Sequence, residues 1–142
     1  MTELTSEVEH AVRQRFHAIE ITGTLQMNLD YLAAGEAAVS MPNQSRWHGI
    51  FESLHGGILM TLADTAACIA ILTRTGQDEV ITTTDMNIRF LAPCLTDVTA
   101  KARIIKFGRS LVPVNVELED AEGKQVAWAQ VTYMRLQRMP RR

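Results

Sequence analysis

The sequence predicts one α+β domain, residues 1–142, in which a mostly antiparallel sheet of about six strands wraps round a single central helix. Three observations lead to this prediction. A chain of 142 residues suits one domain with a sizeable core. Residues 57–74 are apolar almost all round, as in a helix that is buried on most of its circumference. Two strand-like segments precede that helix, and four follow it.

The chain is expected to begin with an amphipathic helix within residues 1–20. Apolar side chains recur there at helical spacings, at Leu4, Val8, Val12, Phe16 and Ile19. The period then changes, and residues 22–31 and 36–41 are predicted to form two strands about the turn Ala33-Ala34-Gly35. A polar loop, residues 43–56, leads from the second strand into the central helix.

Four further strands are predicted after Gly76, which ends the central helix. They are rich in Val, Thr and Ile and cover residues 79–91, 96–106, 111–118 and 125–136. Pro113 cannot donate a hydrogen bond to a sheet ladder, so we expect it at a sheet edge or a bulge. The basic end of the chain, residues 137–142, is expected to be a solvated tail.

Composition and charge argue against several classes of protein. The net charge is −2, whereas nucleic-acid binding needs a concentrated basic surface, so no nucleic-acid partner is expected. The apolar run 58–72 is short for a membrane span, contains Asp64 and lacks flanking anchors, so no membrane contact is expected. The N-terminus carries acids early and does not resemble a signal peptide. Cys68 and Cys94 are expected to be free thiols, which favours a cytoplasmic location.

The central helix carries one polar stripe. Thr61, Asp64, Thr65 and Cys68 fall at positions i, i+3, i+4 and i+7, so they project from one face. An aspartate is almost never fully buried without a partner, and Asp64 lies too far inside the helix to cap it. Asp64 is therefore either a structural residue bonded to a backbone N–H or an arginine, or a residue that takes part in a reaction.

The tripeptide His55-Gly56-Gly57 immediately precedes this helix. Glycines there let a ligand approach the backbone, where free N–H groups and the positive end of the helix dipole face it. Such a site can bind a carbonyl oxygen on which negative charge develops. Gly56 and Asp64 are separated by about 12 Å of helix, too far to act together on one carbon. We therefore expect a homodimer in which Gly56 of one chain meets Asp64 of the other.

The segment HGGILMTLADTAACIAIL, residues 55–72, resembles the central-helix motif H-G-G-x6-D of hot-dog-fold acyl-CoA thioesterases. Residues 82–94 and 123–136 resemble strands of the phenylacetic-acid-degradation (PaaI-like) branch of the hydroxybenzoyl-CoA thioesterase superfamily. The resemblance covers residues 20–137. It implies a hot-dog fold, in which the sheet wraps round the central helix.

The resemblance also implies hydrolysis of an acyl- or aryl-acyl-CoA to the free acid and coenzyme A. Gly56 matches the glycine whose amide polarises the thioester carbonyl. Asp64, contributed by the other subunit, matches the acid that activates water as a general base or attacks as a nucleophile. His55 matches a histidine near the carbonyl or the thiolate, and Thr83 matches a hydroxyl residue that helps to hold the attacking water.

Other substrate contacts are expected beside these residues. Gly57 and Thr65 neighbour the motif glycine and the acid. Relatives often carry an Asn six residues before the motif histidine, where it contributes to carbonyl binding, but this chain has Gly49. Asn43 and His48 are the candidates to replace that donor.

Two further groups have alternative interpretations. The hairpin Lys106-Phe107-Gly108-Arg109-Ser110 either holds the nucleotide phosphates of coenzyme A, through Gly108, Arg109 and Ser110, or forms a solvated turn. Trp47 and Phe51 either wall the acyl pocket or pack between subunits.

No metal or bound cofactor is expected. The spacing of His48 and His55 fits no zinc pattern. Cys68 lacks an evident base and is interpreted as a small buried side chain, not a nucleophile. The alternatives to a thioesterase are a non-catalytic acyl-CoA-binding sensor and a hydratase or dehydratase, whose motifs the chain lacks. The acyl group and the choice between dimer and tetramer stay open.

Overall fold

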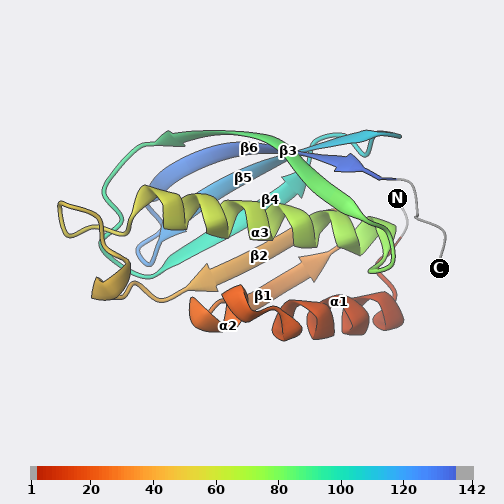
Figure 1. Ribbon diagram of the computed structural model, residues 1–142, viewed down its shortest axis with the longest axis horizontal. Helices are drawn as coiled ribbons and strands as arrows, with labels where there is room; N and C mark the ends of the chain where they lie inside the picture. The colour runs from red at the N-terminus through yellow and green to blue at the C-terminus, as the bar shows by residue number, and fades with distance from the viewer. Residues whose placement is uncertain (1–2, 137–142) are drawn as a thin grey trace.

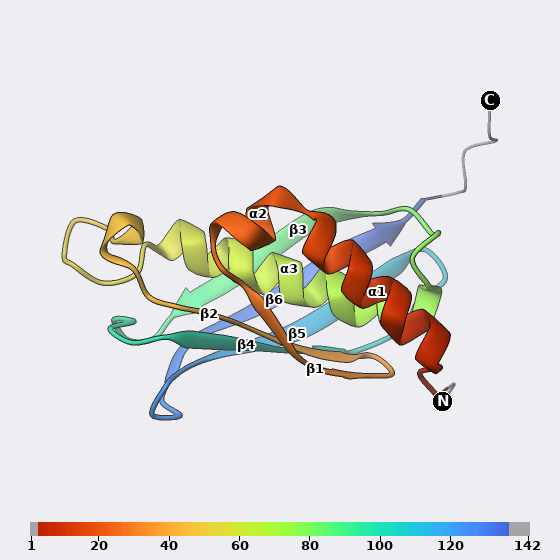
Figure 2. The ribbon, with the colours of Figure 1, turned by 90° about the horizontal axis from the view of Figure 1, so that it is seen from below.

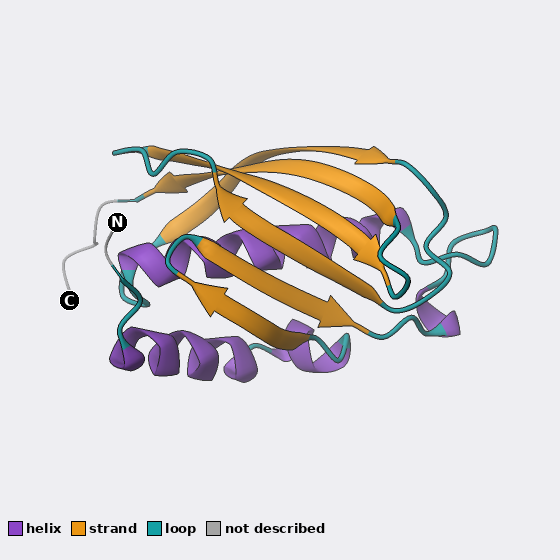
Figure 3. Ribbon diagram, turned by 180° about the vertical axis from the view of Figure 1, so that it is seen from behind, coloured by secondary structure: helices purple, strands orange, loops and turns teal. Residues whose placement is uncertain are grey.

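Six antiparallel strands form one sheet that curves along one side of the longest helix (Figure 1). The computed structural model describes residues 3–136, and the predicted basic tail lies outside these residues. The strands are β1 Asn28–Ala33, β2 Glu36–Met41, β3 Ile81–Phe90, β4 Val98–Ile104, β5 Leu111–Asp120 and β6 Gln125–Arg135. Their order in the sheet is β1-β2-β4-β5-β6-β3, and the rear view in Figure 3 shows the strands side by side, with the helix behind them. The predicted α+β hot-dog architecture is confirmed.

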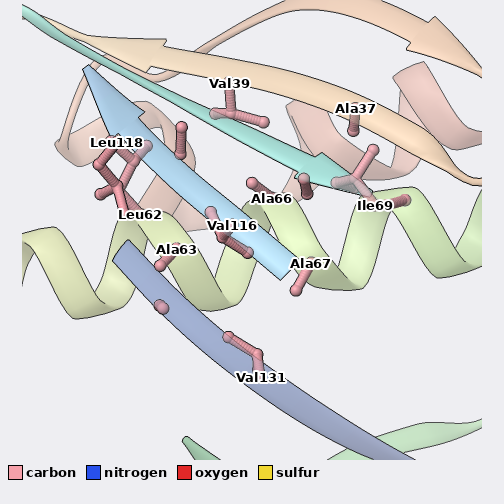
Figure 4. Packing of buried hydrophobic residues seen from close by; sticks show 14 of the residues in the cluster. Ala37, Val39, Leu62, Ala63, Ala66, Ala67, Ile69, Val116, Leu118 and Val131 are labelled. Carbon is pink, nitrogen blue, oxygen red and sulfur yellow. The ribbon is translucent and has the colours of Figure 1, made fainter. Parts of the chain in front are cut away.

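The central helix, α3 (Gly56–Thr75), lies in the hollow of this sheet. Ala63, Ala66 and Ala67 are fully buried and bring the helix backbone close to the strands. Figure 4 shows Leu62 and Ile69 between the helix and the branched side chains of β2, β5 and β6. In length and apolar composition α3 would also pass for a membrane-spanning helix. The core helix of a water-soluble domain meets the same description, because it too is buried among apolar side chains.

Two helices precede the sheet, where one helix and then a strand were predicted. Helix α1 (Ser6–Ala18) packs against α3 and β1, and the short α2 (Glu20–Thr24) follows it (Figure 2). The predicted strand 22–31 is therefore wrong over its first half, since β1 begins only at Asn28. The reason lies in Thr22, which is buried and whose hydroxyl donates to the carbonyls of Phe16 and Ile19 at 2.7 Å. These two hydrogen bonds hold the bend between the helices, and their contribution overrides the strand propensity of residues 22–27.

Pro113 was predicted at a sheet edge or a bulge, but it lies in register in the central strand β5, opposite Thr132 of β6. The β4–β5 ladder ends beside it, with the pair Ile104 and Val114, and the Pro113 carbonyl accepts from the amide of Ile105. The missing N–H of Pro113 therefore faces the frayed end of a ladder, where its loss costs little.

Strand β3 is the outermost strand on the β6 side of the sheet. It pairs with β6 along one edge, and within residues 3–136 its other edge has no strand beside it. The pairing is interrupted by a bulge, because Thr83 is opposite Tyr133 and Asp85 is opposite Thr132, so that Thr84 is the extra residue. Bulges of this kind re-aim side chains and are frequent next to active sites.

Candidate active site

The carboxylate of Asp64, in the middle of α3, is held by two hydroxyl groups from the sheet. Thr83 Oγ1 of β3 and Tyr133 Oη of β6 each lie 2.8 Å from Asp64 Oδ1 and donate to it. The Tyr133 hydroxyl also lies 3.0 Å from the backbone carbonyl of Asp64. Within residues 3–136, the second carboxylate oxygen, Oδ2, accepts no hydrogen bond. Asp64 thus has one oxygen that is fixed by the protein and one that is free for chemistry.

The bulge in β3 explains how both hydroxyls reach the same atom. Thr83 and Tyr133 are directly opposite each other across the β3–β6 pair. Directly opposed side chains project from the same face of a sheet, which here faces α3. The contact between Thr83 and Asp64 brings together two residues that the sequence singled out.

Tyr133 was not among the residues predicted from the sequence. The alternation of β6 turns Val131 and Tyr133 inward, so the strand pattern predicts that the ring is buried. A buried tyrosine hydroxyl usually finds a hydrogen-bond partner. That rule could have pointed to Tyr133, but not to Asp64 as its partner.

Burial controls the protonation of the two groups beside Asp64. It raises the pKa of the Tyr133 phenol far above its ordinary value, and nearby Cys68 and Asp64 add to this effect. Burial also raises the pKa of the Cys68 thiol to about 11, more than the hydrogen bond with Tyr133 lowers it. At neutral pH Tyr133 therefore keeps its proton and is a hydrogen-bond donor, and Cys68 is a neutral thiol unsuited to nucleophilic attack.

The N-terminus of α3 presents a free backbone amide at Gly56. His55 is the N-cap, and its Nδ1 accepts from the Gly57 amide at 2.8 Å. This bond leaves the Gly57 N–H unavailable to a substrate, whereas the Gly56 N–H has no acceptor within residues 3–136. With Nδ1 as acceptor, the neutral His55 ring carries its proton on Nε2, and the residue is exposed.

Only a glycine fits at position 56 without a shift of its neighbour. A Cβ atom there would lie 3.1 Å from the ring of Phe90, at the end of β3. The predicted glycine thus has a packing reason as well as a chemical one. Gly56 and Asp64 are separated by two turns of the same helix, about 12 Å. One chain therefore does not bring the amide and the carboxylate together.

The loop before α3 uses Asn43 as a support. The Asn43 amide donates to the carbonyls of Cys94 and Thr96 at 3.0 and 3.1 Å, and its Oδ1 lies 2.7 Å from His48 Nε2. Both amide hydrogens are therefore engaged, and Asn43 has none left for a substrate carbonyl. Gly49 lies beside His55, and a Cβ atom added at position 49 would be 3.8 Å from the His55 ring.

The hairpin that was a candidate for phosphate binding lies at the opposite end of α3 from Gly56. The guanidinium groups of Arg74 and Arg135 both stack on Phe107, 4.5 Å from its ring centroid. Arg135 also donates to the Gly108 carbonyl at 3.2 Å. Arg109 and Ser110, by contrast, are exposed.

Asp64 also lines a cavity of about 430 Å³, together with Thr65 and Cys68. The Thr65 hydroxyl donates to the carbonyl of Thr61 at 2.8 Å. No group of three or more His, Cys, Asp or Glu side chains within the described residues is placed to hold a metal ion. The chemistry that this site offers is that of one carboxylate beside a cavity, with an amide donor at the start of the same helix.

A hot-dog fold with one acid on its central helix is the arrangement expected of a thioester hydrolase, and the comparisons agree with that class. Residues 51–127 match the family model of the thioesterase superfamily. The chain belongs to this superfamily and is a thioesterase. It is 28% identical to human acyl-coenzyme A thioesterase 13 over an alignment of 132 positions, which covers 89% of this chain and 93% of that protein.

Two solved structures show the same fold. The PaaI protein from the phenylacetic acid degradation operon of E. coli superposes with a TM-score of 0.86 at 23% identity, covering 94% of this chain and 96% of that one. A thioesterase family protein from Silicibacter pomeroyi gives a TM-score of 0.85 at 24% identity, covering 91% and 98%. The resemblance drawn from residues 55–72 is thereby confirmed at the level of fold and superfamily.

Proposed function

We propose that the protein hydrolyses an acyl-CoA thioester to the free acid and coenzyme A, with Asp64 as the catalytic carboxylate. The observation that carries this proposal is the pair of hydroxyls from Thr83 and Tyr133 on Asp64 Oδ1. They fix the carboxylate and leave Oδ2 free. Two curated relatives, human acyl-coenzyme A thioesterase 13 and a Listeria monocytogenes 1,4-dihydroxy-2-naphthoyl-CoA hydrolase, support a coenzyme A thioester as the substrate.

The proposed reaction needs few groups. Asp64 Oδ2 removes a proton from water as the water oxygen bonds to the thioester carbon. The negative charge that develops on the carbonyl oxygen is stabilised by the Gly56 amide and the positive end of the α3 dipole. The C–S bond then breaks and coenzyme A leaves as a thiolate, which is a good leaving group because its thiol has a pKa near 8.5. Direct attack by Oδ2, followed by hydrolysis of the anhydride, would use the same free oxygen.

The amide and the carboxylate come from two copies of the chain in this proposal. An antiparallel pair of α3 helices places Gly56 of one copy opposite Asp64 of the other, which a two-fold axis does twice. The outer edge of β3 supports such a pairing, because its backbone groups face no other strand within residues 3–136. Phe90 and Leu91, 52% and 56% exposed at the end of this strand, add apolar surface that a second copy would bury.

His55 has a supporting role in the same proposal. Its Nδ1 accepts a hydrogen bond from the Gly57 amide, so the proton of the neutral ring is on Nε2. The Nε2–H group can then donate to the substrate carbonyl or to the departing thiolate. The proposed reaction consumes only water and the thioester. It therefore calls for no bound cofactor.

A thiol-release assay on a panel of acyl-CoAs tests this function. The wild-type protein should release free thiol, and Asp64→Asn should lower kcat about 10²–10⁴-fold with little change in KM. Asp30→Asn, the same change on an exposed residue of β1, is the matched control and should leave both constants unchanged. Turnover that survives Asp64→Asn would refute the assigned role. Tight acyl-CoA binding without turnover would instead favour the sensor.

A further inference from the structure

The cavity beside Asp64 runs along α3 toward the C-terminal end of that helix. Its wall includes Asp64, Cys68 and Leu72, which are four residues apart and form one stripe. Ile69 and Ile81 add further apolar side chains to the wall. At about 430 Å³ the cavity falls within the range of roughly 300–1,000 Å³ that is typical of small-molecule sites.

Three hydroxyl groups of this wall, those of Thr22, Thr65 and Tyr133, are already engaged with the protein. Thr22 donates to the carbonyls of Phe16 and Ile19, and Thr65 donates to that of Thr61. Tyr133 donates to Asp64. A polar ligand group placed here would lose its water without gaining a donor from these hydroxyls, which costs free energy. Beside these three hydroxyls the wall therefore favours an apolar occupant.

The mouth of the cavity is also partly apolar. Ile19, Ile21 and Val80 rim it and are 42%, 45% and 49% exposed. Arg15 donates to the carbonyl of Gln77 at 2.9 Å and so ties α1 to the loop that follows α3. An apolar chain that outgrew the cavity would emerge over exposed isoleucine and valine side chains.

We infer that this cavity binds the acyl group of the substrate and selects unbranched apolar chains of medium length. The inference rests on the proposed function, because it places the thioester carbonyl at Asp64. From Asp64 to Leu72 the helix rises about 12 Å. An extended chain advances about 1.2 Å per bond, since a peptide residue of three bonds spans at most about 3.6 Å. The cavity thus accommodates about ten bonds of a saturated chain, as in a decanoyl group.

Cys68 divides this length in half. It lies one helical turn beyond Asp64, about 6 Å, which corresponds to about five bonds of the acyl chain. A bulky side chain at position 68 should close the far half of the cavity and leave room for short acyl groups. Cys68→Ala is the matched control, because it removes volume at the same position.

A series of saturated acyl-CoAs from acetyl to palmitoyl tests the inference in the wild-type protein. The value of kcat/KM should rise by up to about fourfold per methylene as each is buried. The rise should stop near decanoyl, where the cavity ends. In Cys68→Phe the ratio of kcat/KM for decanoyl-CoA to that for butyryl-CoA should fall about 100-fold or more. In Cys68→Ala that ratio should equal or exceed the wild-type ratio.

Binding of the free acids gives a second test, which needs no turnover and no variant. Decanoate should raise the thermal unfolding midpoint of the wild-type protein, because a ligand that binds only the native state stabilises it, and butyrate should not. If the wild-type protein releases thiol from no acyl-CoA, the proposed function fails, while stabilisation by decanoate would still support the cavity as an acyl site.

Three results would overturn the inference in an active enzyme. The first is a kcat/KM that does not depend on chain length, and the second is an equal loss for all acyl groups in Cys68→Phe. The third is a preference for 10-hydroxydecanoyl-CoA over decanoyl-CoA. Glu79 could produce that preference, since its Oε2 is buried at the cavity wall without a partner within residues 3–136, although its Oε1 pairs with Arg135. Equal stabilisation by butyrate and decanoate would also contradict the assignment.

Discussion

Removal of the Tyr133 hydroxyl should slow the chemical step while leaving substrate binding nearly intact. In Tyr133→Phe, Asp64 Oδ1 loses one of its two donors, which lies at 2.8 Å, and the ring that packs against α3 stays. A hydrogen bond to a charged group contributes about 1.5–3 kcal/mol. If that contribution orients Oδ2 toward water in the transition state, kcat should fall about tenfold to 150-fold.

Steady-state kinetics on an acyl-CoA that the enzyme turns over measure this effect, with KM expected to change little. Tyr31 is the other tyrosine of the chain; it is 51% exposed on β1, so Tyr31→Phe is a matched control that should leave kcat unchanged. Thr83→Val removes the second donor. Because the remaining donor still partly holds Oδ1 in each single variant, the double variant should lose more than the product of the single losses. A Tyr133→Phe enzyme with kcat near wild type, or with its whole loss in KM, would refute the positioning role.

The remaining predictions concern stability. Burial raises the pKa of the Cys68 thiol to about 11 from an ordinary 9.0, so between these pH values the unfolded chain has lost a proton that the native state keeps. The free energy of unfolding should therefore fall, by on the order of 2 kcal/mol, as pH rises from 9 to 11. Denaturant titrations should show a weaker fall in Cys68→Ala, and an equal fall would count against this origin. Gly108→Ala places a Cβ 2.1 Å from the Leu111 carbonyl oxygen and should destabilise the protein by about 1–3 kcal/mol. Gly23→Ala, with no neighbour within 4 Å, should be neutral or stabilising by up to about 1 kcal/mol in the same assay.

The sequence was sufficient for the parts of the fold that depend on local pattern. The apolar run of α3 and the alternation of the later strands each repeat over many residues, so their periods are clear. The bend at Thr22 was not predictable, because it depends on a side-chain hydrogen bond to carbonyls three and six residues away. The position of Pro113 in a central strand depends on where the neighbouring ladder ends, which no local pattern encodes.

The candidate site, like the fold, could be predicted from the sequence only in part. An acid on an apolar helix is visible in the sequence, because Asp64 breaks a local rule. Its partner Tyr133 obeys every local rule of a strand and becomes notable only when β6 is laid against α3. The bulge at Thr84, which sets Thr83 opposite Tyr133, involves a single residue and leaves no periodic signal.

The central claim, that two chains share each site, can be tested at Gly56. Gly56 is the first residue of α3, where proline is well tolerated because that N–H is not used by the helix. His55 already has φ −56° and ψ 134°, which a following proline permits. Gly56→Pro should therefore remove the proposed carbonyl donor and keep the fold. Gly56→Ala retains the N–H and introduces the same Cβ beside Phe90, which controls for packing.

The most direct measurement mixes Gly56→Pro with Asp64→Asn under conditions that allow subunits to exchange. Each variant alone should be nearly inactive. Half of the dimers in an equal mixture are mixed, and each of these has one intact site of two, so activity should recover to about a quarter of wild type. Native mass spectrometry would confirm the mixed dimers. Mixed dimers that remain as inactive as the two parents would contradict the shared site.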